Sequence, residues 1–530
     1  MFNQKYLVVL RLLTLLTLVM GLASMAWAQD PIPCTFDVFD PRPLPLCDPN
    51  GGGGGGGGGP FPDFFLSASP ATAVVVPGAS IAYQVTVNPL DGFTGSVQLS
   101  AAGASATFTF SPNPTTGSST MTVTNGSALG SFQVTVTGVG AGLTRTTDVV
   151  LISSTPPAAS RFVPVTPCRV ADTRNAPGPF GGPFLTGRTS REFDIPNSAC
   201  NIPSTAVAYS LNATVVPHGP LGFLTMFPCR QTQPLASNLN SIDGRVKAVA
   251  SIVPAGANGG ACAFASDDTD LILDINGYFV PAANSNALAF YPVTPCRLAD
   301  TRGNGFGGPF GPPSLVGNGT RTFPVSGFCN VPMTAQAYSL NLTAVPHGSL
   351  GFITTWPAGQ TQPAVSTLNA PTGTVTANAA IVAAGANGGV SVLASNDSDL
   401  IIDINGYFAP PGTGGLSLFS LTPCRMLDTR HPPSPAFNGT LSLNVTASGC
   451  GAPASAQAYV LSATVIPPGG LGFLTLWPDG SPQPIASTLN SIDSAVTSNM
   501  AIVPTSNGSV KAFVSNPADL VLDIFGYFAP

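Results

Sequence analysis

The sequence predicts an all-β protein of several domains, and three observations predict it. The pattern Thr-Pro-Cys-Arg-x-x-Asp-Thr-Arg occurs three times, and its cysteines, Cys168, Cys296 and Cys424, lie 128 residues apart. Only 8% of the residues are charged, whereas 59 are glycine and 54 are proline, which favours strands bounded by Gly/Pro turns over helices. Several stretches alternate apolar and polar residues with the period of two that is typical of strands. A repeat of this length indicates tandem units, each large enough for its own core.

Residues 1–28 are predicted to be a signal peptide. Lys5 and Arg11 flank the start of an apolar run, and Ala26-Trp27-Ala28 has the small-x-small pattern of a cleavage site. No later apolar run is long enough to span a bilayer as a helix. We therefore expect an exported protein without a membrane span, either secreted or associated with the cell surface.

Residues 29–62 form a predicted linker rich in proline and glycine. Nine consecutive glycines run from Gly51 to Gly59. A glycine run has no side chains to bury and behaves as a flexible coil, so we expect a tether here.

Residues 63–155 are predicted to be a β-sandwich of about seven strands. Ile81, Tyr83, Val85 and Val87 share one face of an alternating segment. The stretch, with its central motif Gly92-Phe93-Thr94-Gly95, resembles the Ig-like modules of bacterial secreted and surface proteins. That resemblance implies a spacer or adhesion module and no chemistry.

The three repeats cover residues 161–281, 289–409 and 417–530. In the first repeat, Val207, Tyr209, Leu211, Ala213 and Val215 alternate with smaller or polar residues. A turn then leads to a predicted return strand at 222–228. No window predicts a helix, so we expect eight to ten antiparallel strands per repeat, packed as a sandwich or jelly roll.

The repeats resemble a tandem module of exported proteins from environmental bacteria. The residues that carry this resemblance are the Pro-Cys-Arg...Asp-Thr-Arg opening and the Gly-Tyr-Phe close at 277–279, 406–408 and 526–528. The resemblance implies export and an array of units, and it supplies no site. The third copy departs from the others between Arg430 and Cys450, where it is shorter, and at Phe525, which replaces Asn276 and Asn405.

The ten cysteines can be grouped into local pairs, as expected for an exported protein. Cys229 and Cys262 occur only in the first repeat, and the aligned positions of both other repeats lack them together, which predicts that they bond to each other. No C-x-x-C spacing indicates a metal site. The predicted disulfides are Cys34–Cys47, Cys168–Cys200, Cys229–Cys262, Cys296–Cys329 and Cys424–Cys450.

The charged residues shared by all three repeats predict structural ion pairs. The opening and closing strands of a domain are often neighbours, so an arginine of the first could hold an aspartate of the second through two hydrogen bonds. Contact with a ligand is the alternative. The predicted pairs are Arg174 with Asp274, Arg302 with Asp403, and Arg430 with Asp523.

Catalysis and metal binding have little support in the sequence. An arginine beside the aspartate of Asp-Thr-Arg would keep it ionised, unlike the shared-proton pair of an aspartic protease. A nucleophile elbow of the G-x-S-x-G type is absent, and His218 and His347 align with Pro468 of the third repeat. Calcium at residues 267–270 and 274–277 remains an alternative, but the regular spacing of oxygen ligands is missing. We therefore expect no cofactor and no catalytic residues.

One aromatic position is a candidate for ligand binding. Trp356 and Trp477 align with Phe227, and each precedes a proline near the end of a predicted strand. Such a ring could stack on a sugar, and three weak sites in one chain would gain by avidity. The alternative is that the three rings close the core of each sandwich.

These observations predict a secreted, non-enzymatic protein that acts by multivalent binding or adhesion, with a glycan or cell-envelope polymer as its partner. The formal net charge is −6, and no basic cluster indicates a nucleic acid or an anionic membrane as partner. A passive extracellular spacer or coat protein is the first alternative. A secreted hydrolase is the second.

Overall fold

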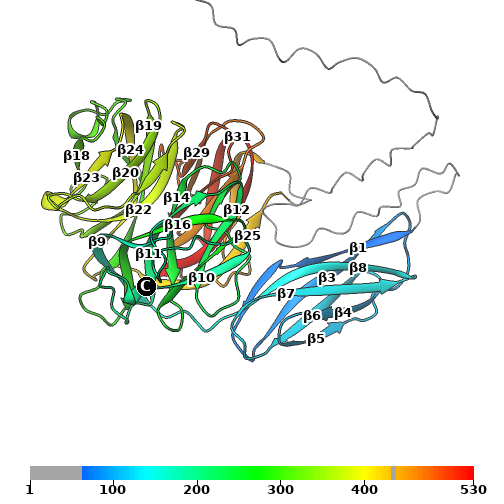
Figure 1. Cartoon of the computed structure of the whole chain (residues 1–530). Helices are drawn as coiled ribbons and strands as arrows, with labels where there is room; N and C mark the ends of the chain where they lie inside the picture. The colour runs from blue at the N-terminus through cyan, green and yellow to red at the C-terminus, as the bar shows by residue number, and fades with distance from the viewer. Residues whose placement is uncertain (1–61, 431–436) are drawn as a thin grey trace, which may run out of the picture. The chain divides into compact units, whose positions relative to one another are not determined.

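The computed structural model of the protein describes residues 62–430 and 437–530. Its secondary structure consists of strands and three single-turn 3-10 helices, so the all-β prediction is confirmed (Figure 1). The predicted signal peptide, the glycine run and the expected Cys34–Cys47 disulfide lie outside the described residues.

The N-terminal sandwich contains two four-stranded sheets. One has the order β1-β3-β6-β5 and the other has the order β2-β8-β7-β4, in which β2 and β8 are parallel. Tyr83, Val85 and Val87 are buried between the sheets, as the alternation predicts. The strands are β1 (Asp63–Ser69), β2 (Thr72–Val75), β3 (Ser80–Leu90), β4 (Gln98–Ala102), β5 (Ala106–Ser111), β6 (Ser118–Asn125), β7 (Gly130–Gly140) and β8 (Leu143–Ser153).

The first repeat is also a sandwich of two four-stranded sheets. The inner sheet has the order β14-β11-β16-β9 and the outer sheet has the order β10-β15-β12-β13. Its elements are β9 (Ser160–Asp172), β10 (Thr189–Asp194), η1 (Ile195–Asn197), β11 (Ala208–Pro217), β12 (Leu221–Pro228), β13 (Leu239–Ser241), β14 (Lys247–Pro254), β15 (Gly260–Ala265) and β16 (Thr269–Pro281).

The second repeat has the same two sheets, with the orders β17-β24-β19-β22 and β18-β23-β20-β21. Its elements are β17 (Ala289–Asp300), η2 (Gly308–Phe310), β18 (Thr320–Pro324), β19 (Ala337–Pro346), β20 (Leu350–Pro357), β21 (Leu368–Ala370), β22 (Thr376–Ala383), η3 (Ala386–Gly388), β23 (Gly389–Ala394) and β24 (Ser398–Ala409).

The third repeat follows the same plan with one continuous strand, β31, that belongs to both sheets. This strand pairs with β25 and β27 in the inner sheet and with β26 and β28 in the outer sheet. The strands are β25 (Ser417–Asp428), β26 (Phe437–Asn444), β27 (Ala458–Ile466), β28 (Leu471–Pro478), β29 (Leu489–Ser491), β30 (Thr497–Pro504) and β31 (Ser509–Ala529).

Each repeat has its own apolar core, and the inner sheets are buried on both faces. In β11, Tyr209, Leu211 and Ala213 point into the core of the first repeat. Ala208, Ser210 and Asn212 on the opposite face are buried as well. A strand that is buried on both faces must be covered from outside its own sandwich. The covering surface comes from the other repeats.

The glycine of each closing Gly-Tyr-Phe is required by the packing of the opening strand. A side chain on Gly277 would collide with the ring of Phe162, and one on Gly406 would collide with the ring of Phe290. Both aromatic rings are fully buried. Close approach of a ring to the backbone therefore explains the glycine in the first two repeats. In the third repeat, a side chain on Gly526 would lie 2.9 Å from the backbone oxygen of Phe419.

Candidate functional site

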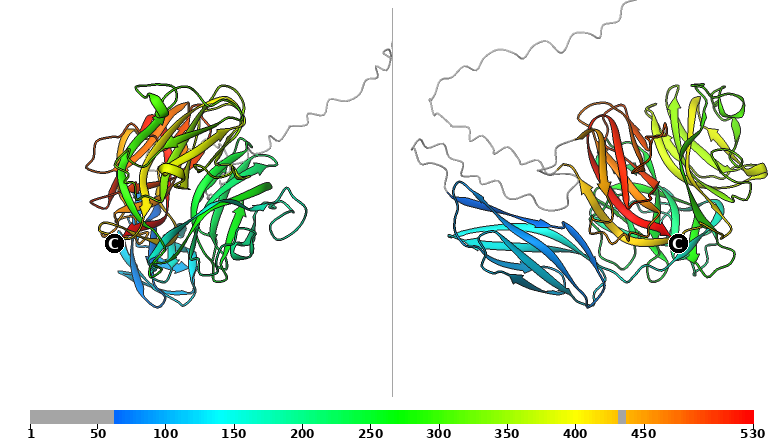
Figure 2. Two further views of the ribbon diagram at one scale, coloured as in Figure 1. Left: turned by 90° about the vertical axis from the view of Figure 1, so that its left-hand side faces the viewer. Right: turned by 180° about the vertical axis from the view of Figure 1, so that it is seen from behind.

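The three repeats form a closed ring in which the last repeat docks on the first. Phe162 pairs with Leu288 and Phe290 pairs with Leu416, so each opening strand meets the segment that leads into the next repeat. Leu418 of the third repeat pairs in the same way with Ser160, which precedes Phe162. The ring also brings β14, β22 and β30 into mutual contact. The two further views in Figure 2 show the three repeats packed side by side.

A shared apolar cluster fills the centre of this ring. It contains aligned residues of all three repeats, among them Ala208, Ala337 and Ala458. The ring centroids of Phe162 and Phe408 are 4.6 Å apart, and those of Phe290 and Phe528 are 4.4 Å apart, so aromatic contacts cross the repeat boundaries. The repeats are therefore parts of one packed body in addition to having separate cores.

Buried aspartates connect each repeat to the next. Asp274 accepts a hydrogen bond from the backbone N–H of Ser366 at 3.2 Å, and Asp403 accepts one from Ser487 at 3.1 Å. Asp523 closes the cycle by accepting one from Ser237 at 2.9 Å. We call the surface that carries the aspartate the leading face of a repeat, and the surface that carries the serine its trailing face.

The arginine that holds each buried aspartate differs from the one predicted. Asp274 is bound by Arg169, whereas Arg174 binds Asp172 through Nε at 2.8 Å. The predicted pairing of Arg174 with Asp274 is therefore wrong, and the same holds for Arg302 with Asp403 and for Arg430 with Asp523. The observed pairs are Arg297 with Asp403, Arg425 with Asp523, Arg302 with Asp300, and Arg430 with Asp428.

The reason for this correction lies in the register of the opening strands. Arg169 stands directly opposite Asp274 in the pairing of β9 with β16, and Arg297 stands opposite Asp403. Arg174 lies beyond the end of β9, where its backbone N–H and guanidinium both turn back to Asp172. Burial raises the pKa of Asp274 above its ordinary value, and the Arg169 guanidinium opposes that rise.

Pairs of asparagines lie next to these aspartates. Asn378 donates from Nδ2 to Asn212 Oδ1 at 2.8 Å, and Asn499 donates in the same way to Asn341 Oδ1 at 2.8 Å. Sequence reasoning missed Asn212 and Asn341 because they stand on a strand face that would be exposed in a lone sandwich. It missed Asn378 and Asn499 because their partners belong to another repeat. The recurrence of asparagine at aligned positions of two repeats was the available signal.

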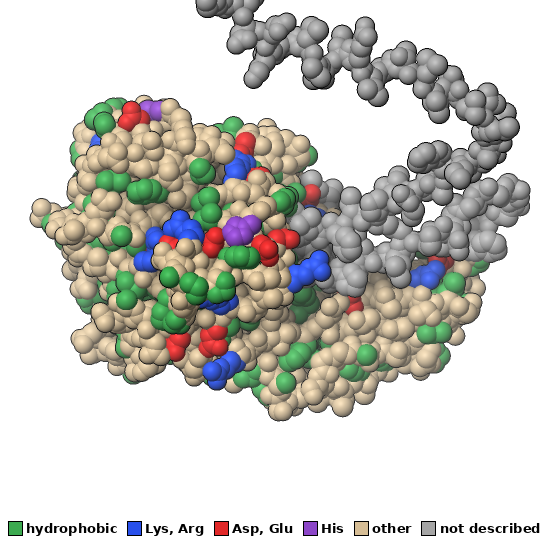
Figure 3. Space-filling model, viewed as in Figure 1, with side chains coloured by type: hydrophobic (Ala, Val, Ile, Leu, Met, Phe, Trp, Pro, Cys, Tyr) green, Lys and Arg blue, Asp and Glu red, His purple; other side chains and the backbone are tan. Residues whose placement is uncertain are grey.

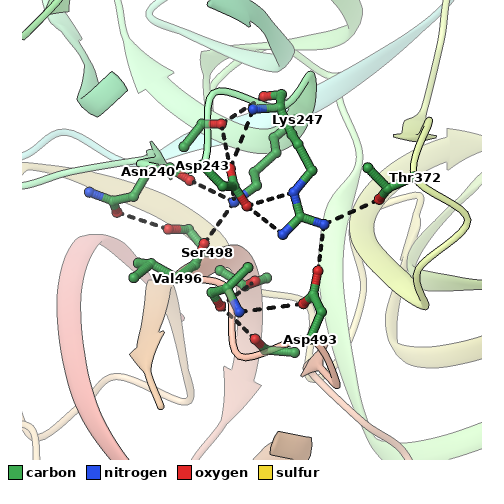
Figure 4. Close-up of polar contacts among 12 residues, drawn as sticks. Asn240, Asp243, Lys247, Thr372, Asp493, Val496 and Ser498 are labelled. Atoms are coloured by element: carbon green, nitrogen blue, oxygen red, sulfur yellow. Dashed lines mark hydrogen bonds and ion pairs between the residues drawn. The ribbon is translucent and has the colours of Figure 1, made fainter. Parts of the chain in front are cut away.

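A polar cluster joins the three repeats where their β-turns meet (Figure 4). Arg245 of the first repeat binds Asp243 of the same repeat, Thr372 of the second and Asp493 of the third. Lys247 Nζ lies 3.1 Å from Asp243 and donates to the backbone oxygen of Val496 at 2.9 Å. Residues of all three repeats line a cavity of about 40 Å³ beside this cluster.

Burial and neighbouring charges shift the pKa values of Asp243 and Lys247 within this cluster. Burial by itself would raise the pKa of Asp243, but Lys247 and Arg245 outweigh burial and hold that pKa below its ordinary value. Burial lowers the pKa of Lys247. Two cationic and two anionic side chains thus satisfy one another, so the cluster acts as a fastening between repeats.

The three aromatic residues predicted to bind a ligand are buried. Phe227, Trp356 and Trp477 are each 3% exposed. The indole N–H of Trp356 donates to the backbone oxygen of Gln360 at 2.9 Å, and that of Trp477 donates to Ser481 at 3.0 Å. These rings therefore present no open face on which a sugar could stack. Phe227 packs against Cys229, Cys262 and Phe264, in a cluster separate from the core of the first repeat.

The polar residues considered for catalysis or calcium have partners within the protein. His218 Nε2 lies 2.9 Å from Asp270, and His347 Nε2 lies 2.8 Å from Asp399. Asp267 accepts hydrogen bonds from Gly222 N and Ser266 Oγ, and Asp268 accepts one from Gly187 N. These bonds tie loops together at the edge of the sandwich. Among the described residues, no group of three or more His, Cys, Asp or Glu side chains is arranged to hold a metal ion.

Four predicted disulfides are confirmed, and each lies within one repeat. They are Cys168–Cys200, Cys229–Cys262, Cys296–Cys329 and Cys424–Cys450. Four intact disulfides are compatible with an extracellular location. In the part of the chain that the structure describes, no helix has the length and apolar character needed to cross a membrane.

Comparison with known proteins gives no family. No family model and no curated protein matches the chain. Domains 4 and 5 of the S-layer protein SbsC match at 23% identity and a TM-score of 0.15, over 18% of this chain and 54% of that one. The ICAM-5 D1–D4 ectodomain fragment matches at 11% identity and a TM-score of 0.15, over 84% of this chain and 100% of that one. A mutant of Salmonella alpha-2-macroglobulin matches at 12% identity and a TM-score of 0.16, over 87% of this chain and 28% of that one. Similarities this low carry no conclusion about function.

Proposed function

We propose that this chain is a secreted, non-enzymatic binding protein whose three repeats form one rigid head for adhesion to an extracellular polymer. The observation that carries the proposal is the closed ring, in which a shared core and hydrogen-bonded aspartates join every repeat to both others. A rigid ring holds three similar outer surfaces in fixed positions, and multivalent contact gains most when the sites are held in place.

The composition of the surface supports an uncharged partner. The face shown in Figure 3 carries few charged side chains, scattered among uncharged ones. Several of the charged groups that exist are already paired within the protein, as Arg245 is with Asp243 and Asp493. Recognition would then depend on hydrogen bonds and van der Waals contacts, which suits a neutral glycan better than a polyanion.

A binding assay with the intact chain tests this proposal. Purified protein is mixed with insoluble cell-wall polysaccharides, and the bound fraction is measured at 50 mM and 500 mM NaCl. We expect retention that hardly changes with salt, since screening weakens only charge-based contacts. Retention lost at high salt would contradict the neutral partner.

A passive extracellular spacer or coat protein is the second candidate. The burial of Phe227, Trp356 and Trp477 favours it, because this removes the aromatic sites that the binding hypothesis first relied on. The same assay separates the two candidates. A chain that is retained by no polysaccharide at either salt concentration would support the spacer and count against the rigid binding head.

A further inference from the structure

The interface between the third and first repeats, which closes the ring, contains different residues from the other two repeat interfaces. Position 249 of the first repeat holds valine where the others hold Asn378 and Asn499, and position 462 of the third holds serine where the others hold Asn212 and Asn341. The strand pairing supports this alignment, since Asn212 stands opposite Ala250, Asn341 opposite Ala379 and Ser462 opposite Met500. The two exceptions therefore occupy the two positions that are hydrogen-bonded to each other at the other interfaces.

Each asparagine pair is fully hydrogen-bonded only when both members are present. Asn378 donates to Asn212 Oδ1 at 2.8 Å and to the backbone oxygen of Thr367 at 2.7 Å, while its own Oδ1 accepts from Ala250 N at 2.9 Å. Asn378 has no exposed surface. A partner without an amide oxygen would leave one of its buried donors unsatisfied.

The interface between the third and first repeats does not require an asparagine pair. Val249 is 1% exposed and packs into the core of the first repeat, and Ser462 is 3% exposed and reaches the backbone oxygen of Asn238 at 3.5 Å. A small hydroxyl therefore stands where the other leading faces carry an amide. A leading face with asparagine would bring an amide oxygen against Val249, and the leading face of the third repeat would bring too few acceptors to Asn378 or Asn499.

From this asymmetry we infer that Val249 and Ser462 form a matched pair that directs the third repeat to the first. The partner that this surface fits is the trailing face of repeat 1, in preference to the trailing face of repeat 2 or 3 of any chain. Each described disulfide closes within a single repeat, so none of them enforces this order. Docking of any other two faces would leave a buried amide group without a hydrogen-bond partner, and this penalises the wrong pairings. The ring therefore closes after three repeats within one chain.

A double-mutant cycle on the full chain tests whether the two residues face each other. Ser462→Asn is expected to lower the Tm by about 2–8 °C, because it places an amide oxygen against Val249. Adding Val249→Asn should restore most of that loss, since the pair then matches the other two interfaces. If the two changes in Tm simply add, the residues do not act as a pair and the inference is overturned.

The mirrored cycle at another interface is the matched control. Asn378→Val should lower the Tm by removing the partners of Asn212 Oδ1 and Ala250 N, and Asn212→Ser should restore part of the loss. Absence of rescue in this cycle would also count against the matched-pair interpretation, because the interface would then tolerate a mismatch without relief.

Refolding tests the selectivity. Wild type and the Val249→Asn, Ser462→Asn double variant are unfolded with their disulfides intact and refolded at high concentration, and the monomer fraction is measured by size exclusion with light scattering. With three equal interfaces, the double variant should form more oligomers than wild type even where its Tm is regained. An unchanged monomer fraction would show that this pair does not direct assembly.

Discussion

Asp274 is the residue on which the contacts between the first two repeats converge. It is 3% exposed, it is held by Arg169 of its own repeat, and it accepts a hydrogen bond from Ser366 of the next. Because burial favours the neutral carboxyl, the ionised form depends on both donors. A single carboxylate thus links the closing strand of one repeat to the trailing face of another.

Removing Arg169 should therefore cost far more than removing Arg174. Arg169→Ala leaves a buried carboxylate without its cation, and we expect a loss of up to about 3–5 kcal/mol in the free energy of unfolding. Arg174→Ala should cost about 0–1 kcal/mol, because the Arg174 side chain is 48% exposed and Asp172 keeps its contact with Arg169. Urea unfolding of both variants measures the difference, and equal losses would contradict the assignment of the clamp to Arg169.

A hydrogen bond that is present at the closing interface is missing between the second and third repeats. Thr343 Oγ1 and Asn490 Oδ1 are buried without a hydrogen bond. At the closing interface, the aligned Asn240 Oδ1 accepts a hydrogen bond from Ser498 Oγ at 3.0 Å, and Ala377 occupies the position of Ser498 in the second repeat. Ala377→Ser should thus supply the missing hydroxyl.

We expect Ala377→Ser to stabilise the protein by about 0.5–1.5 kcal/mol, the usual net value of one internal hydrogen bond. Ser498→Ala is the control and should destabilise it by a similar amount. Thermal unfolding measures both. A destabilising Ala377→Ser would show that Thr343 and Asn490 are already satisfied, for example by a bound water that the hydroxyl displaces.

Asp300, the last residue of β17, predicts how the stability of the protein changes in acid. Burial alone would raise the pKa of Asp300, but hydrogen bonds from Arg302 and Asn304 outweigh it and lower the pKa to about 2, from an ordinary value of 3.8. A carboxyl whose pKa is lower in the folded state adds stability above pH 3.8, and this contribution is lost as the pH falls through about 2. Asp300→Asn should therefore weaken the fall in Tm between pH 4 and pH 2. An identical pH profile for the variant would contradict this role.

At the scale of elements, one strand contact is fastened in a different way in each repeat. Cys229 and Cys262 join the outer strands β12 and β15 of the first repeat. The aligned residues of the third repeat, Asp479 and Lys511, form an ion pair at 3.2 Å. The second repeat has Ala358 and Ser391 at these positions. In addition to the backbone hydrogen bonds of the sheet, this contact thus has a covalent bond in the first repeat, an ion pair in the third and neither in the second.

Replacing the disulfide with the residues of the second repeat should reveal its contribution. We expect Cys229→Ala with Cys262→Ser to lower the free energy of unfolding by about 2–4 kcal/mol, because the bond closes a loop with a sequence separation of 33 residues. Denaturant unfolding measures this loss. A loss below about 0.5 kcal/mol would indicate that the backbone hydrogen bonds and packing of the sheet suffice to fix these strands, as they do in the second repeat.

The elements themselves could be predicted from sequence to a large extent. The alternation at Tyr209, Leu211 and Ala213 predicts β11, and the glycine-containing turns predict the hairpin to β12, because strand periodicity and turn chemistry are local. The Cys229–Cys262 disulfide followed from the absence of both cysteines in the aligned repeats, and the other disulfides followed from local pairing. The partner of Asp274 could not be predicted, since it depends on strand register, and a shift of a few residues changes which arginine stands opposite.

At the scale of the whole molecule, the sequence indicates an array and the structure shows a closed ring. Contacts such as Asn212 with Asn378 join residues that are 166 positions apart, and no local pattern encodes such a pairing. The polar residues on the outer face of β11 are compatible with a solvated sheet until the neighbouring repeat is in place. Burial of both faces is therefore a property of the assembled ring.

The shared aromatic core predicts that the three repeats unfold together. Phe408 is fully buried in the second repeat, and its ring lies 4.6 Å from that of Phe162 and 5.1 Å from that of Phe290. Phe408→Ala should lower the free energy of unfolding by about 3–5 kcal/mol. Because the resulting cavity borders more than one repeat, hydrogen exchange should speed up in β9 and β31 as well as in β24.

Leu340→Ala is the matched control for this prediction. Leu340 is 1% exposed and belongs to the separate core of the second repeat. Leu340→Ala should therefore lower the free energy of unfolding by a comparable amount. The faster exchange should then appear first in β19, β22 and β24, which surround it in the same repeat. If Phe408→Ala produced an equally local pattern, each repeat would unfold on its own, and the rigid head on which multivalent binding depends would be ruled out.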